Sequence, residues 1–339
     1  MKTNAHLPFN EENNMKIKSA KPNDAGRAIH PATARRFMRC TLTSCTVVAV
    51  AAFAAGCGDD DEKKKTSRAA TTPAAFAITA TADGKRKALE FPATVKAGLV
   101  TMTLTNSDRV PRSAGIVRLL GDHTVDDFIK AVDTDEQGAP IPNWIEDGGG
   151  VSTVKPGETA SVTQVLAPGR YAITDDETDG GEGEGPTHAE RGAKGEFTVT
   201  GPASDAELPA QPATLTATDT GEGNDKQYGF EFKGLKAGSN RVRFENTGQE
   251  LHHAVMFPIN EGKTIEDVTA AFTADGPPKG PPPVDFEKGR STQVIDGGIA
   301  QNIELDLQAG SYAVVCFIQD RKGGKPHVAN GMIDELVVK

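Results

Sequence analysis

Several residue types are scarce in this sequence, and each shortage excludes some classes of protein. Aromatic residues make up only 5% of the chain, while glycine (36) and proline (21) are plentiful and valine and threonine recur in alternating runs. This profile is typical of β-rich domains with many turns. Basic residues number 37 against 47 acidic ones, which disfavours nucleic acid and anionic lipid surfaces as partners. The chain also lacks an apolar run of the roughly 20 residues that a membrane-spanning helix requires.

The most apolar stretch, Thr41 to Ala55, has 15 residues and follows three arginines, a pattern typical of a signal peptide. It leads into Ala54-Ala55-Gly56-Cys57, which resembles a bacterial lipobox with alanine where a larger aliphatic residue is usual. The resemblance implies lipidation of Cys57. We therefore predict a leader and lipoprotein signal peptide over 1–56, a lipid-anchored tether over 57–69, and an extracytoplasmic location at the cell-envelope membrane. An ordinary signal peptide, giving a secreted protein, and an uncleaved anchor are the alternatives.

Cysteine is rare in the part that would remain after cleavage. Cys40 and Cys45 lie in the predicted signal peptide and Cys57 would carry the lipid, so Cys316 is the one cysteine left in the folded part. An unpaired thiol in an exported protein is unusual. It is either buried as a small apolar residue or held as a thiolate by a metal ion. Cleavage would also leave 29 basic and 44 acidic residues, a net charge of −15, which favours a soluble cationic partner.

The sequence resembles itself at an offset of about 140 residues. We predict two copies of one domain, over 70–200 and 214–339, joined by a proline-rich linker over 201–213. The echoes are Val95-Lys96-Ala97-Gly98 with Leu235-Lys236-Ala237-Gly238, Asn106-Ser107 with Asn246-Thr247, Thr124-Val125-Asp126-Asp127 with Thr264-Ile265-Glu266-Asp267, and Gly169-Arg170-Tyr171-Ala172 with Gly310-Ser311-Tyr312-Ala313.

Short alternating runs predict strands in both copies. Examples are Val100 to Leu104 and Ile303 to Leu307, and a mostly apolar strand is expected from Tyr312 to Ile318. A short helix is expected from Thr264 to Phe272, with Thr264 as its N-cap. We therefore predict an all-β protein of two tandem Greek-key β-sandwiches, each with a short helix.

A group of metal-ligand residues lies in the second copy. The strand from Tyr312 delivers Cys316 to a glycine-rich loop that returns His327 and Met332. Thiolate, imidazole and thioether are the ligand types of a blue-copper site. Such a site needs a second imidazole, which His252 or its neighbour His253 could supply; adjacent strand residues face opposite sides, so only one of the two is expected to be a ligand.

These residues resemble the cupredoxin family, the blue-copper domains. His252 is similar to the first imidazole ligand of the family, Cys316 to the thiolate, His327 to the second imidazole and Met332 to the axial thioether. Ten residues separate Cys316 from His327, more than is usual in the family. The resemblance implies one copper ion in the C-terminal domain and one-electron transfer.

In the first copy, most of the corresponding positions hold residues that cannot form this site, so that copy is expected to lack copper. The replacements in register are Arg112 and Ser113 for the two histidines, Asp175 for Cys316, His188 near the His327 position, and Ala193 for Met332. The acidic run from Asp175 to Asp179 does not match the spacing of an EF-hand calcium loop, and we predict a solvated loop there.

We expect no catalysis. Paired cupredoxin-like domains occur in copper nitrite reductases and multicopper oxidases, but the family resemblance implies extra histidines in those enzymes, one directly before the cysteine. Val315 stands there in this chain. The predicted folded part has five histidines, at 123, 188, 252, 253 and 327, too few for a second copper centre within the chain. Two alternatives are a copper-free envelope lipoprotein that binds proteins, and a copper storage or delivery protein.

Overall fold

The computed structural model describes residues 72–132, 138–179, 185–274 and 280–339. All of them belong to the compact unit Ser67–Lys339. The predicted signal peptide, Cys57 and the predicted tether lie outside the described residues, so those predictions stay untested. Within the described ranges no helix is long and apolar enough to cross a membrane.

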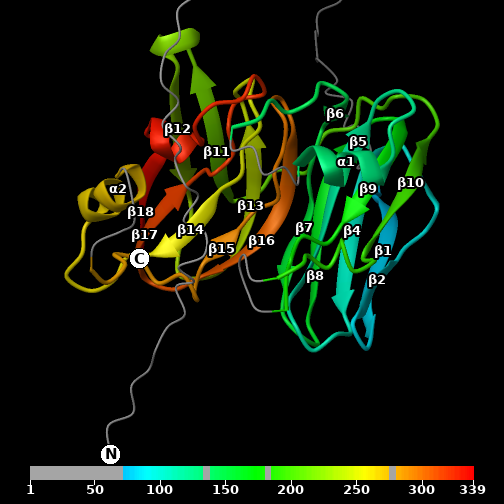
Figure 1. Ribbon diagram of the computed structural model, residues 1–339, viewed down its shortest axis with the longest axis horizontal. Helices are drawn as coiled ribbons and strands as arrows, with labels where there is room; N and C mark the ends of the chain where they lie inside the picture. Colours follow the sequence, from blue (N-terminus) through cyan, green and yellow to red (C-terminus); the bar gives the residue numbers. More distant parts are fainter. Residues whose placement is uncertain (1–71, 133–137, 180–184, 275–279) are drawn as a thin grey trace, which may run out of the picture. The chain divides into compact units, whose positions relative to one another are not determined.

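We call residues 72–200 the N-terminal half. Its described part is built almost entirely of strands, with one short helix (Figure 1). The elements are β1 (Ala74–Asp83), β2 (Arg86–Glu90), β3 (Thr94–Lys96), β4 (Gly98–Asn106), β5 (Arg112–Leu119), α1 (Val125–Val132), β6 (Ile145–Glu146), β7 (Gly150–Val154), β8 (Thr159–Leu166), β9 (Gly169–Thr174) and β10 (Lys194–Thr200).

We call residues 213–339 the C-terminal half. The same kind of succession recurs there, with two additional single turns of 3₁₀ helix. The elements are β11 (Ala213–Thr220), η2 (Gly223–Asp225), β12 (Gln227–Lys233), β13 (Gly238–Asn246), β14 (Val255–Pro258), α2 (Ile265–Thr273), β15 (Arg290–Ser291), β16 (Ala300–Leu307), β17 (Gly310–Val315), η3 (His327–Asn330) and β18 (Ile333–Val338).

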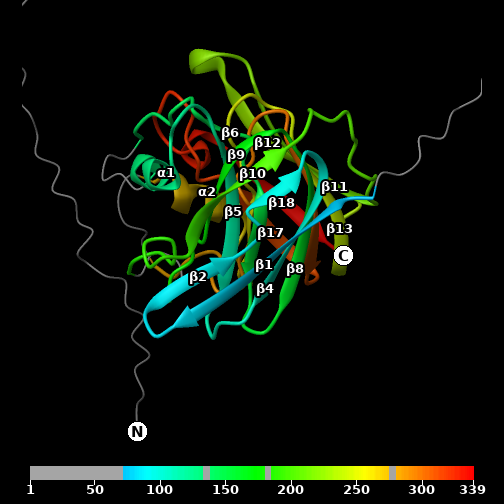
Figure 2. The same ribbon diagram turned by 90° about the vertical axis from the view of Figure 1, so that its right-hand side faces the viewer.

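The described strands form three sheets, and one of them runs through both halves. Its order is β12-β11-β13-β16-β8-β4-β1-β2, and Figure 2 shows its β8-β4-β1-β2 end. The halves join where β16 pairs with β8. A six-stranded sheet belongs to the N-terminal half and the four-stranded sheet β15-β14-β17-β18 to the C-terminal half. The pairing corresponds between the halves: β1 is parallel to β4 as β11 is to β13, and β5 is antiparallel to β9 as β14 is to β17. The predicted all-β class is confirmed.

Alternating side chains explain why these segments are strands. In β16, Ile303, Leu305 and Leu307 are buried while Glu304 and Asp306 face solvent. Burying each such aliphatic side chain contributes roughly 1.5 to 3 kcal/mol before chain entropy is subtracted. The resulting core spans both halves.

Helix α2 follows the prediction closely. Thr264 is its N-cap, and Thr264 and Asp267 form a reciprocal capping box. The strand predicted from Tyr312 to Ile318 is wrong at its end, because β17 stops at Val315. Beyond that residue the backbone leaves the sheet ladder and bonds to the η3 segment instead: Val328 N–H donates to the Cys316 carbonyl at 2.7 Å, and His327 N–H to the Ile318 carbonyl at 2.8 Å.

Candidate metal centre

Three connections of the C-terminal half position the predicted ligand residues. His252 lies just before β14, where its backbone exchanges hydrogen bonds of 3.0 and 2.9 Å with Ile295. The Asn246 amide holds the preceding turn by donating to the carbonyls of Glu250 and Ile295. Cys316 is the first residue beyond β17, and His327 opens η3. Each side chain is therefore carried by backbone that is itself hydrogen-bonded.

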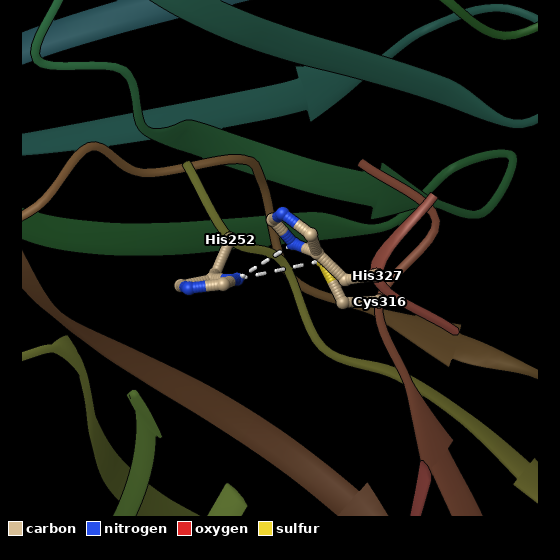
Figure 3. A group of neighbouring side chains, drawn as sticks. All are labelled: His252, Cys316 and His327. Carbon is tan, nitrogen blue, oxygen red and sulfur yellow. Dashed lines mark hydrogen bonds between the residues drawn. The ribbon is translucent and has the colours of Figure 1, made fainter. Parts of the chain in front are cut away.

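The side chains of His252, Cys316 and His327 meet in the interior, and all three residues have no exposed surface. Cys316 Sγ lies 3.7 Å from His252 Nδ1 and 3.6 Å from His327 Nδ1, and the two Nδ1 atoms are 3.1 Å apart (Figure 3). A metal ion bonded to imidazole nitrogen at about 2.0 Å and to thiolate sulfur at about 2.3 Å holds such atoms roughly 3 to 4 Å apart. The spacing fits one ion.

The outer nitrogens of both rings face carboxylates. His252 Nε2 lies 3.1 Å from Asp219 Oδ1, and His327 Nε2 lies 3.0 Å from Asp320 Oδ1. An ionised carboxylate only accepts hydrogen bonds, so each Nε2 carries the ring proton and each Nδ1 keeps a lone pair. Two lone pairs thus face each other across 3.1 Å beside a thiol. A metal cation bound between them would accept both lone pairs.

The pKa values of the two carboxyl groups agree with this assignment. Burial opposes ionisation of Asp219, but hydrogen bonds from the His252 ring and from the N–H groups of Glu250 and Gln249 outweigh it and hold its pKa at about 2. The pKa of Asp320 is also lowered, because hydrogen bonds from Tyr228, His327 and Lys226 outweigh the effect of burial. Both groups are ionised acceptors at neutral pH.

Burial sets the protonation of the inner groups. It raises the pKa of the Cys316 thiol to about 12. Burial, together with the neighbouring His252, lowers the pKa of His327 to about 4. Without a cation the sulfur is a neutral thiol and this imidazole is neutral at pH 7. A metal ion reverses the preference of the sulfur, since it binds the thiolate.

An aromatic ring and a network of charges cover the His327 side of the group. The Tyr228 ring stacks on the His327 ring with centroids 4.4 Å apart, and its hydroxyl donates to Asp320 Oδ1 at 2.9 Å. Lys226 Nζ lies 2.6 Å from Glu250 Oε1 and 3.2 Å from Asp320 Oδ1. Sequence reasoning missed these residues. No motif links Asp219 or Tyr228 to the histidines, because different strands bring them together.

His253 and Met332 have different surroundings. His253 Nε2 accepts a hydrogen bond from the Phe317 N–H at 3.0 Å, so the structure brings His252 rather than His253 to Cys316. Met332 is fully buried in the same core cluster as Cys316, and its N–H donates to the His327 carbonyl at 2.9 Å. Its role as the axial ligand stays a prediction.

The corresponding positions of the N-terminal half hold an ion pair. The buried Arg112 Nε donates to Asp175 Oδ2, and His188 Nδ1 lies 3.2 Å from the same oxygen. The Ser113 N–H also donates to Asp175, at 3.0 Å. The predicted solvated acidic loop is therefore wrong at Asp175, which has no exposed surface. It directly follows β9 and points inward to the guanidinium.

No protein-family model and no curated protein matches the chain. Similar solved structures include a reduced auracyanin from Roseiflexus castenholzii, with 23% identity over 38% of this chain and 97% of that one and a TM-score of 0.25. Auracyanin A, a "blue" copper protein from Chloroflexus aurantiacus, has 18% identity over 38% and 100% of the two chains and a TM-score of 0.25. A copper nitrite reductase from Nitrosomonas europaea has 18% identity over 79% and 94%, with a TM-score of 0.23. At these identities and scores the likenesses carry no weight for function.

Proposed function

We propose that the C-terminal half binds one copper ion through His252, Cys316, His327 and Met332, and that the protein transfers single electrons. One observation carries the proposal: two imidazole lone pairs 3.1 Å apart beside a buried thiol, with both outer nitrogens engaged by carboxylates. Thiolate, two imidazoles and a weak thioether are the ligand set that tolerates both Cu(I) and Cu(II).

The residues of the chain would keep the ligands in place in both oxidation states. Asp219 and Asp320 fix the ring tautomers and hold the rings by their outer nitrogens. The backbone hydrogen bonds of His252 and His327 fix the backbone position from which each side chain extends. With the ligands held in this way, a change of oxidation state would require little movement of the protein.

We propose a carrier rather than an enzyme. The described histidines outside the candidate centre have other partners: the His123 ring stacks on Trp144 at 4.0 Å, His188 faces Asp175, and His253 accepts from Phe317. None of them extends the group of His252, Cys316 and His327, which is the one group among the described residues whose ligand atoms are close enough to hold a metal ion. The position before Cys316 is Val315, which offers no ligand atom.

The setting of this carrier is also proposed. We take residues 70–200 and 214–339 as copies of one domain, of which the first does not bind copper. We place the protein outside the cytoplasm, anchored by a lipid on Cys57, with a soluble cationic redox partner to match its net negative charge.

Absorption spectroscopy of the copper-loaded protein tests the proposal. Cu(II) is expected to give an intense visible charge-transfer band, because the thiolate is a ligand, and Cys316→Ser is expected to abolish it. His253→Gln should keep the band, and His123→Gln in the N-terminal half is the matched control. Colourless Cu(I) binding without the band would favour copper delivery, and no copper binding by calorimetry would favour a protein-binding scaffold.

A further inference from the structure

The long connection between Cys316 and His327 is held by hydrogen bonds to the rest of the protein. Its backbone and side chains bond to one segment of the N-terminal half, residues 138–148. Ile141 N–H donates to the Arg321 carbonyl at 2.9 Å, and Gly324 N–H donates to the Gly138 carbonyl at 3.0 Å. The Arg321 side chain donates to the Ile145 carbonyl at 3.0 Å.

The other end of the same segment meets the backbone partner of the first histidine. Gly148 forms a β-bridge with Ile295, and Ile295 in turn pairs with His252. Next to this bridge, Asp296 N–H donates to the Asp147 carbonyl at 2.8 Å. Residues 138–148 therefore contact the loop that carries His327 at one end and the support of His252 at the other.

We infer that residues 138–148 clamp the proposed copper centre and set the separation of its two imidazoles. The functional meaning of this clamp rests on the proposed copper site. The inference explains two features together. First, the N-terminal half supplies no ligand to the proposed centre but contacts the segments that carry its ligands. Second, the Cys316–His327 interval is long because it has to reach Gly138.

Glycines mark both ends of the clamp. A Cβ on Gly138 would lie 2.6 Å from the Gly324 carbonyl oxygen, and a Cβ on Gly148 would lie 2.5 Å from the Val294 carbonyl oxygen. Real Cβ atoms do not approach backbone oxygen so closely, so alanine at either position would push the two segments apart. The chain offers a matched control: Gly157 has φ +76°, the same as Gly138, but no atom within 4 Å of its Cβ position.

Gly138→Ala and Gly148→Ala, each compared with Gly157→Ala, test the clamp. Alanine introduces similar backbone strain at all three positions because their φ angles are similar. A difference between the variants therefore measures the effect of displacing the neighbouring segment. We expect the first two variants to release copper to a chelator on the order of tenfold faster than the control and to show altered electron paramagnetic resonance parameters. Spectra and release rates equal to those of Gly157→Ala would overturn the inference.

A second readout separates this inference from the copper proposal. Hydrogen exchange of the copper-free variants is expected to accelerate in residues 316–327 for Gly138→Ala but not for Gly157→Ala. If wild type gives no charge-transfer band, the copper proposal fails while this measurement still decides the clamp. If the glycine variants do not fold, Arg321→Gln removes the side-chain bond to Ile145 together with the ion pair to Asp296. Arg243→Gln, which breaks a partly exposed ion pair with Glu245, is its control. Unchanged exchange in Arg321→Gln would then count against the clamp.

Discussion

The two halves place different groups at corresponding positions, an ion pair in the N-terminal half and a thiol with two imidazoles in the C-terminal half. In the N-terminal half a buried carboxylate, Asp175, lies against the guanidinium of Arg112 and the ring of His188. In the C-terminal half a buried thiol, Cys316, lies between two rings with their lone pairs turned inward. A buried anion needs a cation. One half supplies it from a side chain, whereas in the other half the sulfur is a neutral thiol and would become an anion only on binding a metal ion from solution.

The Nε2 atom of the second histidine nevertheless faces a carboxylate in both halves. His188 Nε2 lies 3.2 Å from Asp179 Oδ1, as His327 Nε2 lies 3.0 Å from Asp320 Oδ1. The carboxylate behind the second histidine is thus present in both halves, and the inner groups differ. This comparison predicts that the inner residues make the largest difference to metal binding between the halves.

The largest expected effect comes from exchanging those inner residues. Arg112→His combined with Asp175→Cys would give the N-terminal half a thiol and two imidazoles, since His188 is already in place. We expect the double variant to bind a second copper ion per chain, measured by elemental analysis, and to regain a charge-transfer band in a Cys316→Ser background. A folded double variant that binds no additional copper would show that the backbone frames differ.

Removing the guanidinium should strongly destabilise the fold. Arg112→Met leaves Asp175 buried without its cation, which costs about 3 to 5 kcal/mol of unfolding free energy, measured by denaturant titration. Adding Asp175→Leu should return part of the loss, because the unpaired charge is then gone. Arg243→Met, which breaks a partly exposed pair with Glu245, should change stability by no more than about 1 kcal/mol. Equal effects at the two arginines would contradict the charge argument.

The carboxylates behind the rings should matter less than the inner residues. Asp320→Asn keeps an acceptor for His327 Nε2–H but removes the charge. We expect copper affinity to fall by about 10- to 100-fold and the Cu(II)/Cu(I) potential to rise, because a less basic imidazole favours Cu(II) less. Chelator competition and redox titration measure the two effects. Asp285→Asn, at an exposed pair with Lys288, is the control and should change neither.

The sequence predicts the strands, the capped helix α2 and the set of residues that converges, because these follow from alternation, local capping and the ligand types in chain order. It does not predict the partners that come from distant strands. Asp219 lies 33 residues from His252 along the chain and Asp175 lies 63 from Arg112, and no local pattern links either pair. Asp175 was expected in solvent because runs of acidic residues usually are solvated, and a tertiary ion pair overrides that expectation.

The pH dependence of the stability of the copper-free protein should also differ between the contributions of the two halves. This is the smallest expected effect. Burial lowers the pKa values of His253 and His327 from 6.5 to about 4. Below pH 6.5 these imidazoles therefore bind protons in the unfolded chain but not in the folded chain. Their contribution to the free energy of unfolding is complete above pH 6.5 and is lost as the pH falls toward 4. In the N-terminal half, hydrogen bonding to Lys87 outweighs burial and lowers the pKa of Asp108 below 3.8, so its ion pairs should persist to lower pH.

Thermal unfolding of copper-free protein between pH 7 and pH 4 measures this decline. His327→Gln removes one of these two imidazoles and should flatten part of the decline. A melting temperature that stays constant down to pH 4 in wild type would show that these imidazoles take up protons in the folded state. The rings would then carry the cation themselves when copper is absent, as Arg112 does for Asp175 in the other half.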